Sequence, residues 1–331
     1  MSADLDVVAI GSAIVDVLAR VDDAFLDRHG LVKGTMALID AEQAERLYAD
    51  MGPAVEVSGG AAANTIAGVA SFGAAAAFVG KVRDDQLGTV FGHDIRAAGV
   101  RYEVAAATSG PATARCLVLM TPDAERTMNT FLGAAVGLSS ADIDESLIRR
   151  AAVTFLEGYM WDPPEAIDAL RLAVGAAQSA GRTVAFSLSD PFCVDRHRDE
   201  FLEFIERDVD VLFANEEEAM SLFKTSSLDD ALDELRSRCK VVAVTRGAMG
   251  SVVLSGDATV VVDPAAVQHV VDTTGAGDLY AAGFLVGLVR GADVERCGRL
   301  GSLAAAEVVS HVGARPAVEL SRLAEEAGLL P

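Results

Sequence analysis

The segment 271–285 reads VDTTGAGDLYAAGFL and places one acid, Asp278, where three small residues give way to an apolar run. If a helix begins near Ala276, the N–H groups from Gly275 to Asp278 lack acceptors inside it, and the positive end of its dipole lies behind them. Gly275, Ala276 and Gly277 therefore form a candidate anion hole for a transferring phosphoryl group, where glycine allows close approach. Asp278 could take the proton of an attacking hydroxyl. The alternative is that Asp278 only caps the helix.

A second glycine-containing stretch, VEVSGGAAANTIAGVASFG, covers residues 55–73. Gly59 and Gly60 end an extended run, and Asn64 falls in the first turns of the helix that follows. Glycines permit close approach of a polyhydroxylated ligand, and an Asn amide can donate to one hydroxyl while it accepts from another. Close packing of helix on sheet would explain the three alanines, but it does not explain a polar residue in a buried, Ala-rich helix.

Four further polar residues follow or interrupt strand-like runs. In FANEEEAM (213–220), Asn215 and Glu218 have the spacing of a capping box. The functional alternative is that they hold a water-bound Mg²⁺ against nucleotide phosphates. Asp16 interrupts an alternating run, and Glu157 ends the strand-like VTFLE. Acids at strand ends can bind sugar hydroxyls, whereas as surface residues they would mean little.

Several well-known motifs are missing from the sequence. GAGDLY lacks the third glycine of a dinucleotide fingerprint, and no G-x-x-x-x-G-K-[ST] loop occurs. The five histidines show no metal-ligating spacing, and no G-x-S-x-G elbow is present. A nicotinamide-dependent dehydrogenase is therefore disfavoured, and nucleotide chemistry here must use another architecture.

Composition excludes some partners. Of 331 residues, 51% are hydrophobic and 23% are charged, which supports a folded core throughout. The formal charge of -22 argues against nucleic acid and anionic membranes as partners. The N-terminal apolar run is cut by Asp16, so we expect neither a signal peptide nor a membrane span, and a cytoplasmic protein. The scattered cysteines predict neither a zinc site nor disulfides.

Short apolar runs alternate with longer helical ones. The expected strands cover 6–11, 75–80, 182–188, 209–214 and 240–247, with a hairpin at 250–255 and 258–263. The expected helices cover 61–72, 86–98, 164–180, 197–207, 216–223, 228–238, 277–290, 293–310 and 318–327. This alternation predicts an α/β fold with a doubly wound, mostly parallel sheet flanked by helices.

Two regions, 12–40 and 112–131, instead alternate apolar with polar residues, which suits a half-exposed antiparallel sheet. We expect them to form a small β lid over the carboxyl-terminal edge of the main sheet, where ligands of α/β proteins bind. The main domain then comprises 1–11, 41–111 and 132–331.

The order and spacing of these motifs resemble one known family. SGGAAANTIAGVASFGAAAAFVGKVRDDQLG (58–88) is similar to the first signature of the ribokinase-like, or PfkB, carbohydrate kinases, and DTTGAGDLYAAGFLVGL (272–288) is similar to the second. NEEE matches the N-x-x-E motif that the family carries between them. The resemblance covers essentially the whole chain, and it implies a Rossmann-like domain with a β lid, ATP as cofactor and Mg²⁺.

The resemblance also implies residue roles. Asp278 would be the catalytic base, and Gly275, Ala276 and Gly277 the anion hole. Substrate hydroxyls would bind residues Asp16, Gly59, Gly60, Asn64 and Glu157. Cofactor and metal contacts would involve Asn215, Glu218, Thr245 and Gly247, with Asp272 and Thr274 at positions that hold a monovalent cation, K⁺, in some members.

The acceptor is open at this point. VKGTMALID (32–40) and the run from Arg115 resemble a bacterial branch similar to adenosine kinases, in which Met36, Met128 and Phe131 could flank a purine. A nucleoside, with adenosine first, is therefore favoured over ribose, fructose or 2-keto-3-deoxygluconate. A non-catalytic ligand sensor on the same fold is a further alternative. We expect a monomer or a homodimer formed through the lid.

Overall fold

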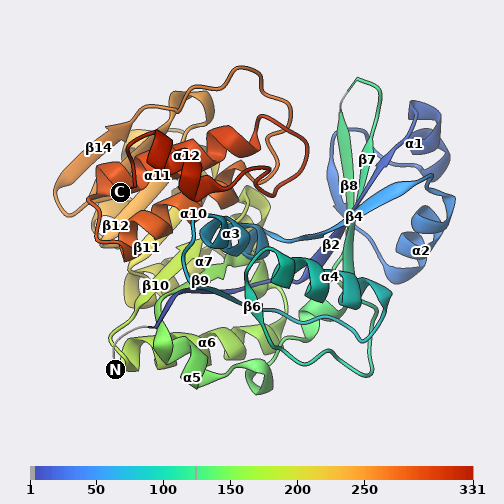
Figure 1. Ribbon diagram of the computed structural model, residues 1–331, viewed down its shortest axis with the longest axis horizontal. Coiled ribbons are helices and arrows are strands. Elements are labelled where there is room, and N and C mark those ends of the chain that lie inside the picture. Colours follow the sequence, from blue (N-terminus) through green and yellow to red (C-terminus); the bar gives the residue numbers. More distant parts are fainter. Residues whose placement is uncertain (1–3, 124, 331) are drawn as a thin grey trace.

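The computed structural model describes residues 4–123 and 125–330. It contains a nine-stranded sheet in the order β14-β13-β12-β11-β10-β9-β1-β5-β6 and a five-stranded sheet in the order β3-β8-β7-β2-β4. The second sheet stands beside the first as a separate lobe, at the right of Figure 1. This arrangement confirms the prediction of a large, mostly parallel sheet with a small lid.

The main sheet is parallel from β12 to β6, and β13 and β14 add an antiparallel hairpin at one edge. Its strands are β1 (Leu5–Ile10), β5 (Ala76–Val79), β6 (Arg101–Tyr102), β9 (Ala151–Glu157), β10 (Thr183–Ser187), β11 (Val211–Asn215), β12 (Val241–Thr245), β13 (Ser251–Ser255) and β14 (Ala258–Val262). Apart from the short edge strand β6, the parallel strands are mostly apolar because both faces of the sheet are covered by helices.

Two hydrophobic cores lie on the two faces of this sheet. Along β1, Val7 and Ala9 face one core while Val8 and Ile10 face the other, as the alternation of side chains on a strand requires. The first core is covered by α3 (Ala61–Ser71), α4 (Gln86–Ala97), α10 (Ala276–Val289), α11 (Val294–Val308) and α12 (Leu320–Glu326). The second is covered by α5 (Glu145–Arg150), α6 (Pro164–Ser179), α7 (Pro191–Asp208), α8 (Glu216–Phe223) and α9 (Leu228–Arg236).

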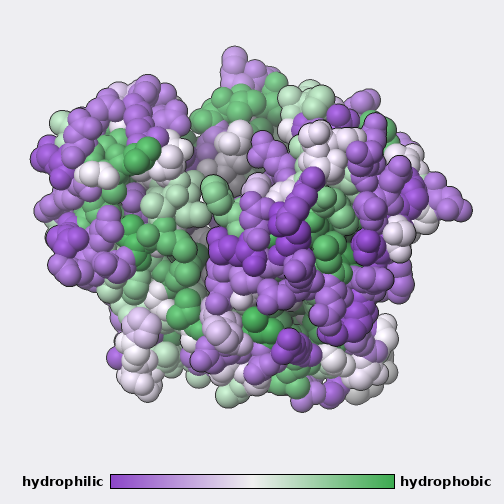
Figure 2. Space-filling view, turned by 180° about the vertical axis from the view of Figure 1, so that it is seen from behind, coloured by the Kyte–Doolittle hydropathy of each residue, from purple (hydrophilic) through white to green (hydrophobic). Residues whose placement is uncertain are grey.

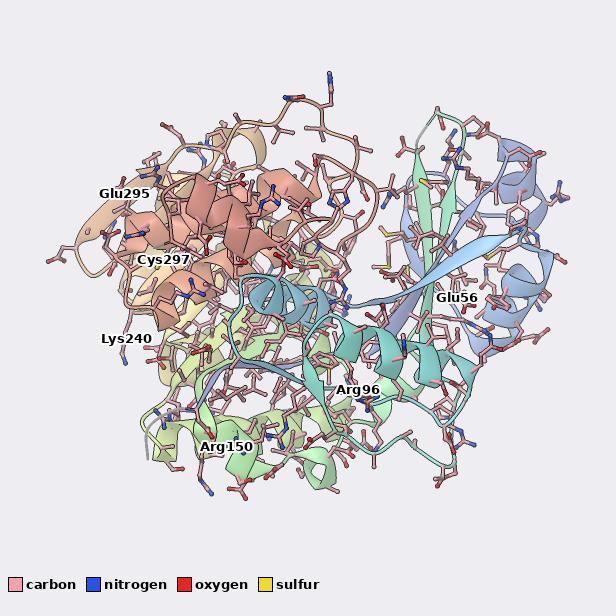
Figure 3. The ribbon with its side chains drawn as sticks, viewed as in Figure 1. Glu56, Arg96, Arg150, Lys240, Glu295 and Cys297 are labelled. Carbon is pink, nitrogen blue, oxygen red and sulfur yellow. The ribbon has the colours of Figure 1, made fainter. Side chains whose placement is uncertain are left out.

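The two ends of the parallel strands differ in chemistry. Ion pairs join residues that directly precede strands: Asp4 with Arg150 at 2.8 Å, and Asp210 with Lys240 at 2.6 Å. Figure 3 shows Arg150 and Lys240 on the part of the main domain remote from the lid. The opposite, carboxyl-terminal ends of the strands face the lid and carry a variety of polar side chains. This edge of the sheet is where α/β proteins bind ligands.

The lid contains β2 (Ile14–Arg20), β3 (Met36–Leu38), β4 (Ala54–Gly59), β7 (Ala114–Met120) and β8 (Arg126–Phe131), with α1 (Asp23–His29) and α2 (Ala41–Asp50). The helices cover the face of the sheet away from the main domain (Figure 1). Their apolar side chains Phe25, Leu26 and Leu47 join β-strand residues in the first hydrophobic core. The other face of the lid sheet borders the hollow between the two lobes.

The structure corrects the lid in three respects. Strand β4 pairs with β2, so the lid extends beyond the predicted ranges 12–40 and 112–131. The range 12–40 is not purely alternating strand, because it contains α1, which Asp22 caps at its start and Gly30 ends in a left-handed turn. The sheet is mixed rather than antiparallel, since β2 pairs with β7 and β3 with β8 in parallel.

Candidate active site

A cavity of about 570 Å³ lies between the lid and the main domain. It collects residues from the carboxyl-terminal ends of four parallel strands, from the first turns of α3 and α10, and from the inner face of the lid. Hydrophobic residues gather along the hollow in Figure 2, where the lid is at the left. The volume lies within the range of small-molecule sites.

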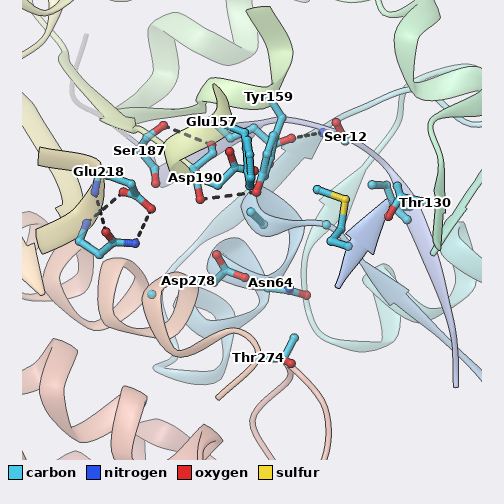
Figure 4. A pocket seen from close by; sticks show the side chains of 18 of the residues that line it. Ser12, Asn64, Thr130, Glu157, Tyr159, Ser187, Asp190, Glu218, Thr274 and Asp278 are labelled. Carbon is cyan, nitrogen blue, oxygen red and sulfur yellow. Dashed lines mark hydrogen bonds between the residues drawn. The ribbon is translucent and has the colours of Figure 1, made fainter. Parts of the chain in front are cut away.

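Asp278 and Asn64 meet in this cavity. The amide nitrogen of Asn64 donates to the Asp278 carboxylate at 2.9 Å, although the residues are far apart in sequence, and Figure 4 shows them next to each other. They meet because α3 and α10 pack closely: a Cβ on Gly68 would lie 2.7 Å from Ala282. Burial raises the pKa of Asp278 to about 6, against the lowering effects of Asn64 and Arg315. A carboxylate with this pKa can act as a base at neutral pH.

The first turn of α10 has free N–H groups. Within the described part of the chain, the N–H groups of Gly275, Gly277 and Asp278 donate to no residue, whereas that of Ala276 donates to Thr273 at 3.2 Å. Three of the four predicted donors are thus free. A Cβ on Gly277 would meet nothing within 4 Å, and this residue lines the cavity. Unpaired N–H groups at the start of a helix form an anion site.

The first turn of α3 is arranged differently, because a buried carboxylate occupies it. Glu157 is fully buried, and its two oxygens accept from the N–H groups of Ser12 and Ala62, each at 2.7 Å. Burial raises the pKa of Glu157 to about 7, while both backbone donors act to lower it. Glu157 borders the cavity, but its hydrogen bonds inside the protein hold the loop after β1 against α3.

Asp16 and Asn64 keep hydrogen-bonding capacity for a ligand. Asp16 lines the cavity and accepts no hydrogen bond from another described residue. The carbonyl oxygen of Asn64 is buried and also has no partner there. Gly60 borders the cavity, and Gly59 makes room for Asp16, because a Cβ on Gly59 would lie 2.2 Å from that carboxylate. Burial raises the pKa of Asp16 to about 7.

Asn215 and Glu218 form the predicted capping box at the start of α8. The backbone and side-chain amides of Asn215 donate to Glu218 at 3.0 and 2.7 Å, and Glu218 N–H donates back at 2.8 Å. Both residues also line the cavity, so the capping and ligand interpretations are compatible. Burial raises the pKa of Glu218 to about 7. Thr245 at the end of β12 lines the cavity as well, whereas Gly247 does not.

A comparison with known proteins now identifies the class. Residues 5–320 match the model of the pfkB family carbohydrate kinases. The chain belongs to this family. It is therefore an ATP-dependent kinase, with a nucleoside or a sugar as the class of acceptor.

Solved structures and curated relatives agree with this assignment. The adenosine kinase from Sinorhizobium meliloti is 51% identical, covers 98% of this chain and 100% of its own, and has a TM-score of 0.92. A probable sugar kinase from Rhizobium etli CFN 42 is 47% identical, covers 99% of this chain and 100% of its own, with a TM-score of 0.93. The adenosine kinase of Saccharomyces cerevisiae is 28% identical over 92% of this chain and 95% of its own length.

In this PfkB kinase, the predicted cation residues Asp272 and Thr274 have protein partners. Arg126 of the lid strand β8 binds the Asp272 carboxylate at 2.6 Å and the Thr274 hydroxyl at 2.9 Å. The N–H groups of Thr274 and Gly313 donate to Asp272 at 3.0 and 2.7 Å. The Arg126 guanidinium therefore occupies the position next to Asp272 that a bound cation would take. In this conformation the residues do not fit a bound K⁺.

The inner wall of the lid is mostly apolar. Met36 and Met128 are register partners on β3 and β8, and both line the cavity. Phe131 does not line it. The other residues of the lid strands on this wall are Ile14, Asp16, Leu38, Cys116 and Thr130.

Sequence reasoning missed several residues that face the cavity. Tyr159 and Phe192 supply aromatic surface, and Ser189 has a left-handed backbone with φ of 78°. The N-cap Asp190 followed by Pro191 is the signal that could have placed the start of α7 before residue 197. Arg126 and Arg315 do not line the cavity but contact residues beside it. They were also missed, because nothing in their local sequence indicates which distant segment each contacts.

Proposed function

We propose that this kinase transfers the γ-phosphoryl group of ATP to the hydroxymethyl group of a nucleoside, with adenosine as the preferred acceptor. The observation that carries the proposal is the meeting of Asp278 with Asn64 directly beside the unpaired N–H groups of α10. A base, a hydroxyl-binding amide and an anion site then converge on one position, which is what phosphoryl transfer chiefly requires.

On the acceptor side, the Asp16 carboxylate and the free Asn64 carbonyl oxygen bind ribose hydroxyl groups. Both are acceptors without a partner among the described residues, so a hydroxyl donor satisfies them. Asp278 takes the proton from the attacking hydroxyl as the hydroxyl oxygen bonds to the γ-phosphorus of ATP. The bond from this phosphorus to the β–γ bridging oxygen breaks, and ADP leaves. Its pKa of about 6 leaves it mostly ionised at neutral pH.

On the phosphate side, the N–H groups of Gly275, Gly277 and Asp278 hold the transferred group. Thr245 borders the nucleotide. Among residues 4–123 and 125–330, no three His, Cys, Asp or Glu side chains gather to hold a metal ion. Glu218 would therefore hold Mg²⁺ through water, together with the nucleotide phosphates, and the metal would neutralise charge on those phosphates. Closure of the lid excludes water and so limits ATP hydrolysis.

The apolar wall of the lid favours a nucleoside over a free sugar. A purine attached to the ribose would lie against Met36, Leu38 and Met128, with Tyr159 and Phe192 on the main-domain side. Burial of a flat apolar group there contributes affinity that a free sugar cannot gain. The likeness to the Sinorhizobium meliloti adenosine kinase supports the same choice.

A free sugar is the second candidate, and the likeness to the probable sugar kinase of Rhizobium etli supports it. The experiment that separates the candidates offers Mg²⁺-ATP with adenosine, ribose, fructose or 2-keto-3-deoxygluconate and measures ADP release. Adenosine is expected to give the highest kcat/KM. A preference for a free sugar would overturn the acceptor, and binding without ADP release for every compound would favour a ligand sensor.

The same assay tests the base. Asp278→Asn keeps the shape and should lower kcat by about 10²–10⁴-fold while nucleotide affinity is retained. Asp293→Asn is the matched control, because Asp293 caps the next helix, α11, through the N–H of Arg296 and does not line the cavity. Wild-type turnover by Asp278→Asn would remove Asp278 from the role of base.

A further inference from the structure

Arg315 is a half-buried cation that the proposed mechanism does not use. It lies after α11, and its guanidinium donates to the carbonyl oxygen of Ser58 at 2.9 and 3.0 Å, to the Ser58 hydroxyl at 2.9 Å and to the carbonyl oxygen of Ala63 at 2.5 Å. No carboxylate of the described residues forms an ion pair with it. Burial lowers the pKa of Arg315 to about 10. The carboxylates of Asp94, Asp16 and Asp278 attract this guanidinium without contacting it, and all of its hydrogen bonds go to neutral groups. A desolvated cation held in this way is costly, so its placement needs a reason.

The two residues that Arg315 holds flank the junction between lid and main domain. Ser58 lies in β4 of the lid sheet, and Ala63 lies in α3 of the main domain. Between them, Gly60 has a positive φ of 98°, and a Cβ there would lie 2.3 Å from the carbonyl oxygen of Ser12. Arg315 therefore fixes the angle at which β4 enters α3, and with it the position of the neighbouring Asn64.

The residues before Arg315 contact the phosphate side of the site. Gly313 N–H donates to the Asp272 carboxylate at 2.7 Å, and a Cβ on Gly275 would lie 2.7 Å from that of Ala314. We call residues 313–315 the brace. Three consecutive residues thus contact the Asp272 carboxylate, the left-handed Gly275 before α10, and residues 58–63, which join the lid to the main domain and which we call the lid hinge.

We propose that Arg315 is a positioning residue that holds the acceptor-binding end of α3 and the phosphate-binding end of α10 in register. This inference rests on the proposed function and adds to it a cause for the Asn64–Asp278 distance. When the brace is intact, movement of the lid hinge on acceptor binding is transmitted to the loop that holds the phosphoryl group. Acceptor and nucleotide then favour each other's binding.

The charge of Arg315 gives a second effect. The groups that face Asp278 include Asn64 on α3, Asp16 on β2, Glu157 on β9 and Glu218 on α8. Arg315 lowers the pKa of both Asp278 and Asp16, whereas Arg126 acts on Asp16. Loss of the guanidinium should therefore move the acid limb of the pH–rate profile to higher pH.

The test compares Arg315→Met and Arg315→Lys with Arg290→Met. Arg290 is a matched control, because its guanidinium donates to the carbonyl oxygen of Phe72 at 2.9 Å and so joins the opposite ends of α10 and α3, away from the cavity. With adenosine and a non-hydrolysable ATP analogue as probes, calorimetry measures the affinity of each alone and with the other.

Arg315→Met should lower kcat and the mutual enhancement of binding by about tenfold. The acid limb of the pH–rate profile of this variant should move to higher pH. Arg315→Lys should keep the position of that limb, because it retains the charge, but not full kcat, because an ammonium cannot bridge residues 58 and 63. Arg290→Met should retain the wild-type kcat, the acid limb of the pH–rate profile and the mutual enhancement of acceptor and nucleotide binding.

Hydrogen exchange gives a readout that does not depend on the acceptor. Peptides covering 58–64 and 272–278 should exchange faster in Arg315→Met and keep the wild-type rate in Arg290→Met. If the wild-type protein phosphorylated no acceptor, the proposed function would fail while this exchange result still tested the brace. Wild-type kcat and unchanged exchange in Arg315→Met, or in Arg315→Lys if the first variant does not fold, would overturn the role of Arg315.

Discussion

Two helix N-termini face the same cavity, and their first turns are built alike but used differently. Helix α3 follows Gly60 and helix α10 follows Gly275, each with a positive φ. Each places one polar side chain, Asn64 or Asp278, near its start. At α3, the buried Glu157 carboxylate accepts from the Ala62 N–H, whereas at α10 the N–H groups of Gly277 and Asp278 donate to no described residue.

This difference supports the proposed assignment of the acceptor to the α3 turn and of the phosphoryl group to the α10 turn. A resident carboxylate neutralises the positive end of α3, so this turn can receive neutral hydroxyl groups but repels an anion. The open turn of α10 can receive the phosphoryl group. Under the proposed function, the same backbone motif serves as an acceptor site at α3 and as a phosphate site at α10, and Glu157 of β9 sets the difference in charge between them.

Among changes to the backbone of the two turns, the largest effect should follow from closing the α10 turn. Gly277→Ala adds a Cβ to the open space beside the free N–H groups, so it should preserve the fold and lower kcat/KM about 100-fold, the size expected for loss of an anion-hole contact. Gly175→Ala in α6 is the control, because a Cβ there also meets nothing within 4 Å but lies outside the cavity. Wild-type activity of Gly277→Ala would mean that the phosphoryl group lies elsewhere.

Opening the α3 turn should make it resemble α10. Glu157→Ala leaves the N–H groups of Ser12 and Ala62 buried without an acceptor, at a cost of about 1–3 kcal/mol for each. The melting temperature should fall, and inorganic phosphate should raise it more in the variant than in the wild type. Glu157→Gln, which keeps one acceptor oxygen, should be intermediate. An equal response to phosphate in all three proteins would contradict the comparison.

The pH–rate profile should report the base of α10. Burial raises the pKa of Asp278 to about 6, and only the ionised form accepts the proton. We expect kcat/KM for the acceptor to fall by about tenfold for each pH unit below this value and to level off above it. A profile that stays flat down to pH 4 would exclude Asp278 as the base.

The smallest effect concerns the stability of the ligand-free protein. The folded-state pKa of Asp16 is raised to about 7 from 3.8, so its ionisation costs stability above that pH, and the cost declines as pH falls from about 7 toward 4. Asp16→Asn should therefore melt a few degrees higher than wild type at pH 8, with a smaller difference at pH 5. Thermal scans at both pH values measure this, and an equal difference at both would contradict it.

Much of the main domain was predictable, because most of its parallel strands are apolar runs that stand out in sequence. The central strand β9 was recognised only as a strand-like segment, and the two-residue β6 was not predicted. The confirmed hairpin β13–β14 and helices such as α3, α6 and α10 follow from local patterns. The lid was less predictable. Nothing local to residues 54–59 tells that this strand pairs with β2, since register between distant strands is set by tertiary packing.

The candidate site shows the same division. The glycines, Asp278, Asn64 and the Asn215–Glu218 pair were found because their local context is unusual. The sequence did not show that Glu157 would bind the backbone of α3, or that Arg126 and Arg315 would contact segments more than a hundred residues away. Such contacts depend on topology, which composition and spacing do not encode one residue at a time.

The parallel pairing of β2 with β7 has a consequence for how the chain reaches its native state. Ile14 pairs with Ala114, so about a hundred residues must be synthesised after β2 before its neighbour β7 is present. Contacts between residues so far apart in sequence form slowly. Until then β2 can pair only with the nearer β4. During synthesis the lobe that covers the cavity should therefore mature late, after the first crossovers of the main sheet have formed, and substitutions in β7 should slow refolding of the lobe more than equivalent ones in β4.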